Sequence, residues 1–139
     1  MIILDTNVIS EPTKQRGNPA VHAWLDRQMT ETLYITATSL SELLTGIELI
    51  QAGKRKDILA ASVTALIDRL FGSRVLAFDQ QAAGNYAKVV GRTRSNGYTI
   101  SVTDAQIAAI AAIHGFTVAT RDTAPFLAAG TPVLNPWIA

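Results

Sequence analysis

The sequence predicts an α/β fold built around a parallel sheet. Its first four residues, Met1 to Leu4, are all apolar, which indicates a strand buried on both faces, as strands of parallel sheets are. Turn signals and apolar runs then alternate along the chain, and short runs with strand character are separated by longer segments with helical spacing. Strands that alternate with helices favour parallel pairing through helical crossovers.

The individual elements follow from local signals taken in chain order. After the opening strand, residues 11–17 are short and polar and predict a loop. Asn18 and Pro19 then predict a helix start, because asparagine is a favoured N-cap and proline fits the first helical position. The remaining strands are expected at 33–36, 74–78, 116–120 and 133–134. The remaining helices are expected at 39–52, at 80–95, at 104–114 and after 122, with a further helix that ends at about 70 and is separated from the one at 39–52 by Gly53 and the basic triplet 54–56.

Two of these helices differ in how their apolar residues are distributed. In the helix at 39–52, leucine and isoleucine recur at helical spacing and form one apolar face. In the helix at 104–114, alanine and isoleucine occupy almost every position, so we expect burial on most sides. Trp24 and the apolar face of residues 40–50 are candidates for contact with a partner, although burial in the core is the favoured interpretation of that face.

The composition excludes several classes of function. The chain has no cysteine, which removes disulfides, thiolate catalysis and cysteine-based zinc sites. Its 139 residues, 48% of them apolar, suit one domain spanning residues 1–139. No basic leader with a long apolar stretch and no membrane-spanning segment is apparent, so a cytoplasmic protein without membrane contact is expected.

Four acidic residues are predicted to meet at one edge of the sheet. Asp5 and Asp122 each follow a predicted strand, and Glu42 and Asp104 lie in the first turns of predicted helices. The carboxyl edge of such a sheet is where α/β folds place their ligand crevice. Clustered carboxylates repel one another and are costly to bury without a counter-charge. The cluster therefore predicts a bound cation, and hard oxygen ligands favour Mg²⁺ or Mn²⁺.

A carboxylate-held magnesium site usually acts on phosphates, where the ion activates a water and a second ion stabilises the leaving oxygen. The chain has 12 Lys and Arg against 11 Asp and Glu, so engaging four acids in a site would leave a basic surface suited to a polyanion. The hydroxyls of Thr6, Thr103 and Thr120 are candidates for orienting ligands or a phosphate. Arg121 could contact a backbone phosphate, although an ordinary surface arginine is the simpler interpretation.

Each acid also has a purely structural interpretation, in which it stabilises a turn or a helix N-terminus. His22 and His114 both lie on predicted helices and are interpreted as structural or exposed, so no histidine site competes with the acids. The structural alternatives are a cap for the first strand-to-helix turn (Asp5, with Asx-type bonds from Asn7), a capping box (Ser39 with Glu42), a partner for the helix dipole (Asp104) and an N-cap (Asp122).

Several stretches of the chain together resemble the PIN-domain family, and within it the VapC toxins, particularly their FitB-like branch. The resemblance runs from residue 1 to the C-terminus and implies a three-layer α/β/α sandwich with a central parallel sheet of about five strands. It also implies a ribonuclease that depends on Mg²⁺ or Mn²⁺. The stretches that carry it are Leu4–Glu11, Ser41–Leu43, Thr103–Ala109, Val118–Asp122 and Asn135–Trp137.

The resemblance assigns catalytic and metal-binding roles to the four acids, Asp5, Glu42, Asp104 and Asp122. Asp5 and Asp104 are expected as the main metal ligands, and Glu42 and Asp122 as ligands that complete the shell directly or through water. Many family members carry a further acid immediately before a phenylalanine, whereas this chain has Pro125 there. We therefore expect a second metal ion to bind weakly, or only with substrate.

The resemblance also implies partners. VapC-like toxins pair with a small VapB- or FitA-like antitoxin, which inserts a C-terminal segment into the acidic groove and binds operator DNA. A homodimer that assembles with antitoxin into a hetero-oligomer, and an RNA substrate such as tRNA, are expected.

The alternative function is a weakly active or inactive interaction module that binds the antitoxin and tunes operator binding. A phosphatase is disfavoured, because Asn7 stands where its second aspartate is required.

Overall fold

The computed structural model describes residues 1–139 and contains one five-stranded sheet. The strand order is β3-β2-β1-β4-β5, and every neighbouring pair is parallel. The predicted parallel sheet of about five strands is thus confirmed, with β1 in its centre. The strands are β1 (Ile2–Leu4), β2 (Leu33–Thr36), β3 (Val75–Leu76), β4 (Thr117–Ala119) and β5 (Val133–Leu134).

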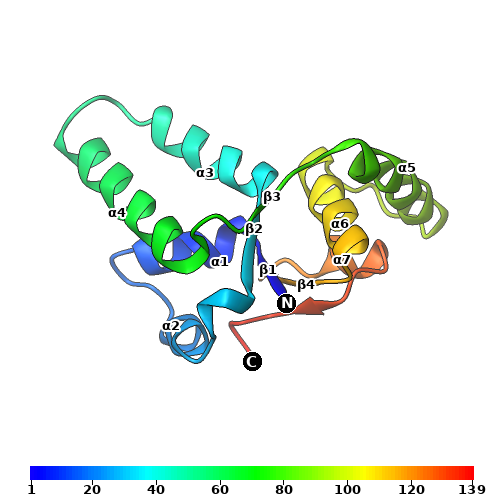
Figure 1. Ribbon diagram of the computed structural model, residues 1–139, viewed down its shortest axis with the longest axis horizontal. Coiled ribbons are helices and arrows are strands. Elements are labelled where there is room, and N and C mark those ends of the chain that lie inside the picture. The colour runs from blue at the N-terminus through cyan, green and yellow to red at the C-terminus, as the bar shows by residue number, and fades with distance from the viewer.

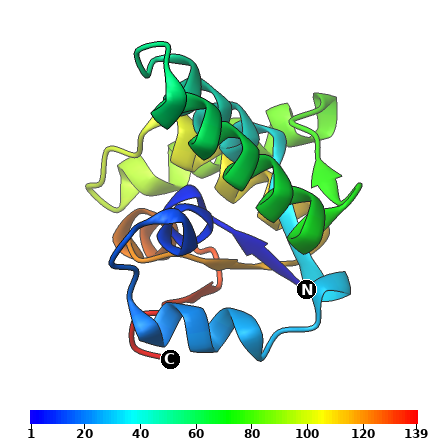
Figure 2. The same cartoon turned by 90° about the vertical axis from the view of Figure 1, so that its left-hand side faces the viewer.

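Helices cover both faces of the sheet, which gives the predicted three layers. In Figure 1, α3 and α4 lie on one side of the strands and α5 and α6 on the other. Figure 2 faces the first of these layers and shows α4 above, α1 in the middle and α2 below. The helices are α1 (Thr6–Ser10), α2 (Pro19–Asp26), α3 (Ala37–Glu48), α4 (Lys54–Phe71), α5 (Gln80–Ser95), α6 (Val102–His114) and α7 (Ala124–Ala128), with 3-10 turns η1 (Glu11–Thr13) and η2 (Thr30–Thr32).

The central strand β1 supplies side chains to both apolar layers. Leu4 packs in the cluster formed with α1 to α4, whereas Ile3 packs in the cluster formed with α5 to α7. Successive side chains of a strand point to opposite faces of the sheet, so a strand covered on both sides has to be apolar throughout. This double burial holds the carboxyl end of β1 firmly in the middle of the fold.

The local signals placed most elements correctly but misplaced the ends of α3, α4 and α6 and gave β3 too many residues. The side chain of Thr36 accepts a hydrogen bond from the backbone N–H of Ser39, so α3 begins two residues earlier than expected. It also ends earlier, at Glu48, because the chain turns before Gly53. The basic triplet 54–56 forms the first turn of α4 rather than a linker. The structure also contains α1 and η1, where the sequence predicted only a loop or nothing.

Trp24 is part of the core, and the expectation that it contacts a partner was wrong. Its exposed fraction is 4%, and it packs in the cluster with α1, α3 and α4. On α3, Leu43 and Ile47 are buried, as the core interpretation requires, whereas Leu44 is 49% exposed. Helix α6 is buried on most sides, as predicted. No helix is both long and apolar enough to cross a membrane.

Candidate active site

Asp5 occupies the carboxyl end of the central strand, where the sequence placed it. Its backbone N–H donates to the carbonyl of Ala119 on β4, at 2.9 Å, and its side chain caps α1. One carboxylate oxygen, Oδ1, accepts the backbone N–H of Thr6 at 2.8 Å, and the other, Oδ2, accepts the hydroxyl of Thr120 at 2.8 Å. The structural interpretation of Asp5 as a cap is therefore confirmed. A cap normally lies at the surface, however, and this residue is only 7% exposed.

Thr120 links the two chain segments that border Asp5. Its fully buried hydroxyl donates to Asp5 and accepts from the side-chain amide of Asn7 at 3.3 Å and from the backbone N–H of Asp122 at 3.1 Å. The amide oxygen of Asn7 in turn accepts the backbone N–H of Arg121 at 3.2 Å. Asn7 therefore ties α1 to a distant loop instead of forming the local bonds that the sequence suggested. Thr120 orients a carboxylate rather than facing a ligand.

Glu42 lies on α3 with an exposed side chain directed toward the first helix. Its Oε1 accepts a hydrogen bond from the hydroxyl of Thr6 at 3.2 Å. The capping box expected from Ser39 and Glu42 was wrong, because Thr36 provides the cap of α3. The geometry thus leaves Glu42 without the structural role that competed with a functional one.

Asp104 and Asp122 complete the predicted group. Asp104 lies half-buried in the first turn of α6, and its backbone N–H donates to the hydroxyl of Ser101 at 3.2 Å, which caps that helix. This position agrees with the helix-dipole interpretation. Asp122 is exposed in the loop before α7, and Thr123 rather than Asp122 occupies the N-cap position of that helix. The N-cap interpretation of Asp122 was therefore wrong.

Electrostatic interactions show which of the four acids lie near one another. Burial raises the pKa of Asp5 to about 6 against the opposing hydrogen bonds from Thr120 and Thr6, and the charges of Asp104 and Glu42 raise it further. Burial also raises the pKa of Asp104, followed by the nearby charge of Asp122 and opposed by the Ser101 hydrogen bond. Perturbed carboxyl groups of this kind are typical of functional sites.

The acids form a loose group rather than a ready-made metal cage. In their present rotamers, no three acidic or histidine side chains lie close enough together to hold an ion. Asp5 is fixed by its hydrogen bonds, whereas Glu42 and Asp122 are exposed and their side chains can rotate without disturbing the core. The structure therefore brings the four residues into one neighbourhood, and their role as ligands stays a prediction.

One buried acid near this site was not anticipated from the sequence. Glu11, only 6% exposed, follows α1, and its oxygens contact the Lys14 ammonium at 3.0 Å and the backbone N–H of Asn18 at 2.9 Å. These contacts lower the pKa of Glu11. The spacing of three between Glu11 and Lys14 could have indicated the ion pair, but its burial depends on how α2 folds back. Another contact that the sequence did not reveal joins Arg121 to the ring of Trp137.

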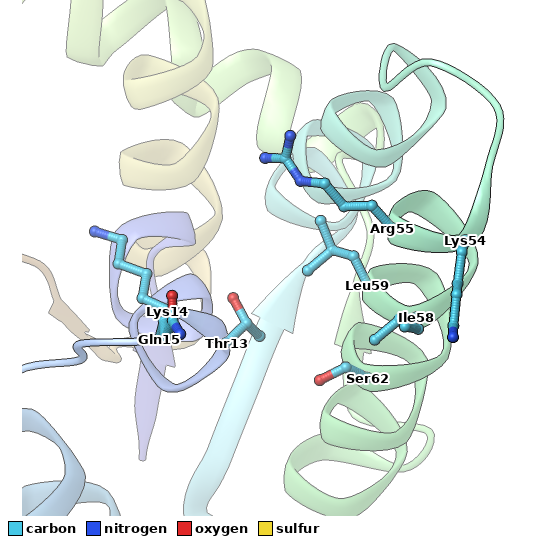
Figure 3. A pocket seen from close by; sticks show the side chains of 8 residues that line it. All are labelled: Thr13, Lys14, Gln15, Lys54, Arg55, Ile58, Leu59 and Ser62. Atoms are coloured by element: carbon cyan, nitrogen blue, oxygen red, sulfur yellow. The ribbon is translucent and has the colours of Figure 1, made fainter.

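The surface also has a large pocket that none of the four acids lines. Its volume is about 960 Å³, and it lies between the end of η1 with the two residues that follow and the first half of α4. Leu59 and Ser62 project from α4 toward the 3-10 turn, whereas Lys54 points away from it (Figure 3). No acidic residue lines this pocket, so it is a second surface feature rather than part of the acidic group. Its lining consists of Thr13, Lys14, Gln15, Lys54, Arg55, Ile58, Leu59 and Ser62.

Comparison with known proteins agrees with this architecture. The chain matches the PIN domain over residues 2–130. It therefore belongs to the PIN-domain family. The motifs around Asp5, Glu42, Asp104 and Asp122 already resembled this family in the sequence.

Within the family, the chain is similar over nearly its whole length to proteins of three bacteria. It is 48% identical to the plasmid stability protein StbB of Pseudomonas syringae pv. tomato, with 99% of each chain covered. It is 46% identical to a VapC ribonuclease of Sinorhizobium fredii, covering 99% of this chain and 98% of the other, and 44% identical to toxin FitB of Neisseria gonorrhoeae, covering 99% of each. A structure of FitAB bound to an IR36 DNA fragment superposes with a TM-score of 0.94 at 43% identity, covering 99% of this chain and 96% of that one.

Proposed function

We propose that the protein is a metal-dependent endoribonuclease and the toxin component of a VapBC-type toxin–antitoxin system. The observation that carries the proposal is the buried carboxylate of Asp5, which sits at the carboxyl edge of the central strand with Glu42 and Asp104 near it and no cation of the chain paired to it. The similarity to a VapC ribonuclease over 99% of the chain supports the choice of RNA as substrate.

The donor set fits Mg²⁺ or Mn²⁺. Asp5, Glu42, Asp104 and Asp122 offer only carboxylate oxygens, the ligands that such hard cations prefer, and burial together with like charge gives Asp5 a need for a counter-ion. Asp5 and Asp104 would be the main ligands, and Glu42 and Asp122 would complete the shell directly or through water. When bound, the ion would supply activation of a water and stabilisation of negative charge on the phosphate.

The chain's own residues would prepare this reaction by fixing Asp5. Hydrolysis adds water across one P–O bond of the RNA backbone, so that the attacking oxygen loses a proton and the leaving sugar oxygen gains one. Thr120 and the N–H of Thr6 each bind one oxygen of Asp5, which fixes the carboxylate plane and leaves a further lone pair on each oxygen. Such hydrogen-bonded support of ligands typically contributes 10- to 100-fold in metal affinity or activity.

The position that departs from the family pattern is a buried proline. Pro125 lies in the first turn of α7 immediately before the buried Phe126, so the chain supplies no carboxylate there. Asp122 is then the only acid of the last motif. We infer that a second ion binds weakly or only together with the RNA.

The pocket between η1 and α4 is the surface that we assign to the antitoxin. Ile58 is 60% exposed there beside Leu59, and Lys14 and Arg55 add positive charge. An amphipathic helix with acidic residues at its edges would fit such a groove. The structure of FitAB bound to an IR36 DNA fragment supports a complex of toxin and antitoxin that binds DNA. We propose that homodimers and toxin–antitoxin hetero-oligomers are the assembled forms and that this chain reaches operator DNA only through the antitoxin.

Two variants test this assignment of the pocket to the antitoxin. The first carries Ile58→Glu alone, and the second carries Ile58→Glu together with Arg55→Glu. Both should weaken co-purification with the cognate antitoxin, while RNA cleavage by the free chain stays unchanged. An Arg69→Glu variant, altered elsewhere on α4, serves as the matched control. If both pocket variants bind the antitoxin as tightly as wild type, the antitoxin binds at another surface.

One observation favours a second candidate function, an interaction module with weak or lost nuclease activity. No three carboxylates are in position to hold an ion in the present rotamers, as would suit a domain that acts mainly through its antitoxin. In that case the acidic group would bind a basic segment of the antitoxin. The function would then be assembly of the toxin–antitoxin complex on operator DNA.

Cleavage of RNA separates the two functions. Wild-type protein, Asp104→Asn and a control Asp68→Asn, all free of antitoxin, would be incubated with total RNA including tRNA in Mg²⁺, Mn²⁺ or EDTA. We expect discrete fragments from wild type and Asp68→Asn in metal only, and none from Asp104→Asn. If no protein cuts under any condition while wild type and antitoxin still retard operator DNA, the interaction module is the function.

A further inference from the structure

Arg121 lies in the middle of the loop that borders the acidic group. The residues on either side of it are Thr120, whose hydroxyl binds Asp5, and Asp122. The backbone N–H of Arg121 donates to Asn7, and that of Asp122 donates to Thr120. The backbone is thus held on both sides of Arg121, and its exposed side chain starts from the rim of the acidic group.

The guanidinium of Arg121 is supported by the ring of Trp137. Its Cζ lies 5.3 Å from the centroid of the indole, within the range of a cation–π contact. The indole is itself well placed, because Trp137 packs against the core cluster of α1 to α4 and its backbone N–H donates to the side chain of Asn135 at 2.9 Å. The last residues of the chain therefore provide a platform beside the candidate site.

The hydrogen-bonding groups of this guanidinium are free, in contrast to those of Arg74 and Arg92. Arg74 donates to three backbone carbonyls, at 2.8 to 2.9 Å, and Arg92 donates to the carbonyl of Ala129 at 3.0 Å. The side chain of Arg121 forms no ion pair and no hydrogen bond within the chain. The nearby Glu11 is already paired with Lys14. The guanidinium is therefore held by the indole of Trp137, while its N–H donors remain available to a ligand.

A stacked guanidinium is well suited to bind phosphate. The ring covers one face of the group, while the N–H donors point outward in its plane and can form two parallel hydrogen bonds with phosphate oxygens. Because the side chain is already ordered, less conformational entropy is lost on binding. An RNA strand entering an acidic site is also repelled by the carboxylates, so a cation at the rim favours its approach.

We propose that Arg121, supported by Trp137, binds an RNA phosphate adjacent to the one that is cleaved. This inference rests on the proposed ribonuclease function and names one contact that holds the substrate. Arg121 is a substrate-binding residue and Trp137 a positioning residue that acts through it.

The first measurement is the binding of total tRNA to proteins that carry Asp104→Asn, so that binding is followed in Mg²⁺ without cleavage. In this background we expect Arg121→Ala to weaken binding about tenfold and to lower the slope of log affinity against log KCl by about one. Trp137→Leu leaves the charge unchanged, so it should weaken binding with little change in slope, and Trp137→Phe should restore most of the affinity. Arg69→Ala, on the distant end of α4, is the control that should bind like its parent.

The second measurement uses the chain without the Asp104 substitution. Arg121→Ala should raise KM more than it lowers kcat, and its affinity for Mn²⁺ by titration calorimetry should equal that of wild type. Melting temperatures verify that the Trp137 variants are folded.

The possible outcomes separate this inference from the proposed function. If Arg121→Ala binds tRNA as tightly as Arg69→Ala, the phosphate contact is overturned even when wild type cleaves RNA. If wild type never cleaves but Arg121→Ala still weakens tRNA binding, the nuclease function and the position next to a cleaved phosphate are overturned, and only a phosphate contact with RNA stands. If folded Trp137→Leu binds like its parent, the supporting role of the indole is overturned.

Discussion

Two buried carboxylates lie at opposite ends of helix α1 and have opposite environments. Asp5 caps the N-terminus of the helix and Glu11 its C-terminus, and both are less than a tenth exposed. The helix dipole would favour charge on Asp5 and disfavour it on Glu11. The pKa values move the other way, because the chain provides Glu11 with Lys14, whereas it surrounds Asp5 with apolar residues and further acids.

The difference indicates what each carboxylate is for. Glu11 is compensated within the chain and joins η1 to the start of α2, so its charge serves the fold. Asp5 receives two hydrogen bonds but no cation, so its charge is compensated only when something else binds. A carboxylate that costs stability in the isolated chain is typical of a functional site. Substitutions at the two positions should therefore have opposite effects on activity and stability.

The largest expected effect is the loss of RNA cleavage on Asp5→Asn. The amide keeps the shape, and its oxygen can still accept the Thr6 N–H, but its NH2 group cannot accept the Thr120 hydroxyl, and the charge that would hold the ion is lost. We expect cleavage to fall by more than about 100-fold, beyond what the loss of a supporting residue causes. At neutral pH without metal, the melting temperature should stay equal or rise. A variant that retains cleavage would remove Asp5 from the proposed site.

The pH dependence of stability should show the same contrast. The folded-state pKa of Asp5 is raised from 3.8 to about 6, so its favourable contribution is complete below its unfolded pKa and is lost as pH rises toward and through about 6. A shift of this size corresponds to roughly 3 kcal/mol. The pKa of Glu11 is lowered, so its contribution is present above the unfolded pKa and is lost as pH falls through the folded value.

The measurement is the free energy of unfolding against pH in EDTA for wild type, Asp5→Asn and Glu11→Gln. Asp5→Asn should abolish most of the decline between pH 4 and 7, with Asp104, whose pKa is also raised, responsible for the remainder. Glu11→Gln should instead flatten the acid side. Saturating Mg²⁺ should reverse the decline in wild type by stabilising the ionised carboxylates. A wild-type profile that is flat from pH 4 to 7 would contradict the raised pKa of Asp5.

The sequence predicted the edge of the sheet at which these groups lie, because that edge follows from local patterns. An apolar run followed by an acid places Asp5 at the end of a strand, and parallel strands end at one side. Asn18 caps α2 as the sequence predicted, and α5 has the predicted bounds. The strands at 33–36 and 133–134 have the predicted bounds.

What the sequence could not predict depends on contacts between distant residues. Asp5 and Thr120 are 115 positions apart, and no local pattern reveals that a threonine hydroxyl faces that carboxylate. Helix α1 has only five residues, too few for a periodic signal, so its capping acids were placed in a turn and a loop. The burial of Glu11 and the stacking of Arg121 on Trp137 likewise arise only when the segments pack.

A smaller effect is expected from Glu11→Gln, which sharpens the contrast from the structural side. The amide can still accept the N–H of Asn18, but the ion pair with the mostly exposed Lys14 is lost. Replacing a charged hydrogen bond by a neutral one should lower the free energy of unfolding by about 1 kcal/mol. Metal-dependent cleavage at low temperature should stay within a factor of about two, in contrast with Asp5→Asn. Denaturant titration and initial rates measure both, and a large loss of kcat would assign Glu11 to the reaction as well.

The smallest expected effect concerns Ser39, a buried polar group that neither the fold nor the proposed site compensates. Its hydroxyl is fully buried in the first turn of α3 and has no hydrogen-bond partner, although its backbone N–H is bound by Thr36. No ligand of the proposed site compensates this hydroxyl, so its burial only costs stability. Ser39→Ala removes that cost and should raise the free energy of unfolding by a few tenths to about 1 kcal/mol.

Thr36→Ala, which removes the cap of the same helix, should destabilise the protein by about 1 kcal/mol. The two substitutions lie three residues apart and differ in sign because one hydroxyl has a partner and the other has none. Cleavage should be unchanged by Ser39→Ala, since the hydroxyl contacts no acid of the site. Should Ser39→Ala destabilise the protein as much as Thr36→Ala, its hydroxyl has a partner such as a buried water. Asp5 would then differ from Ser39, because the chain buries its carboxylate without a cation and only a cation from solution would neutralise it.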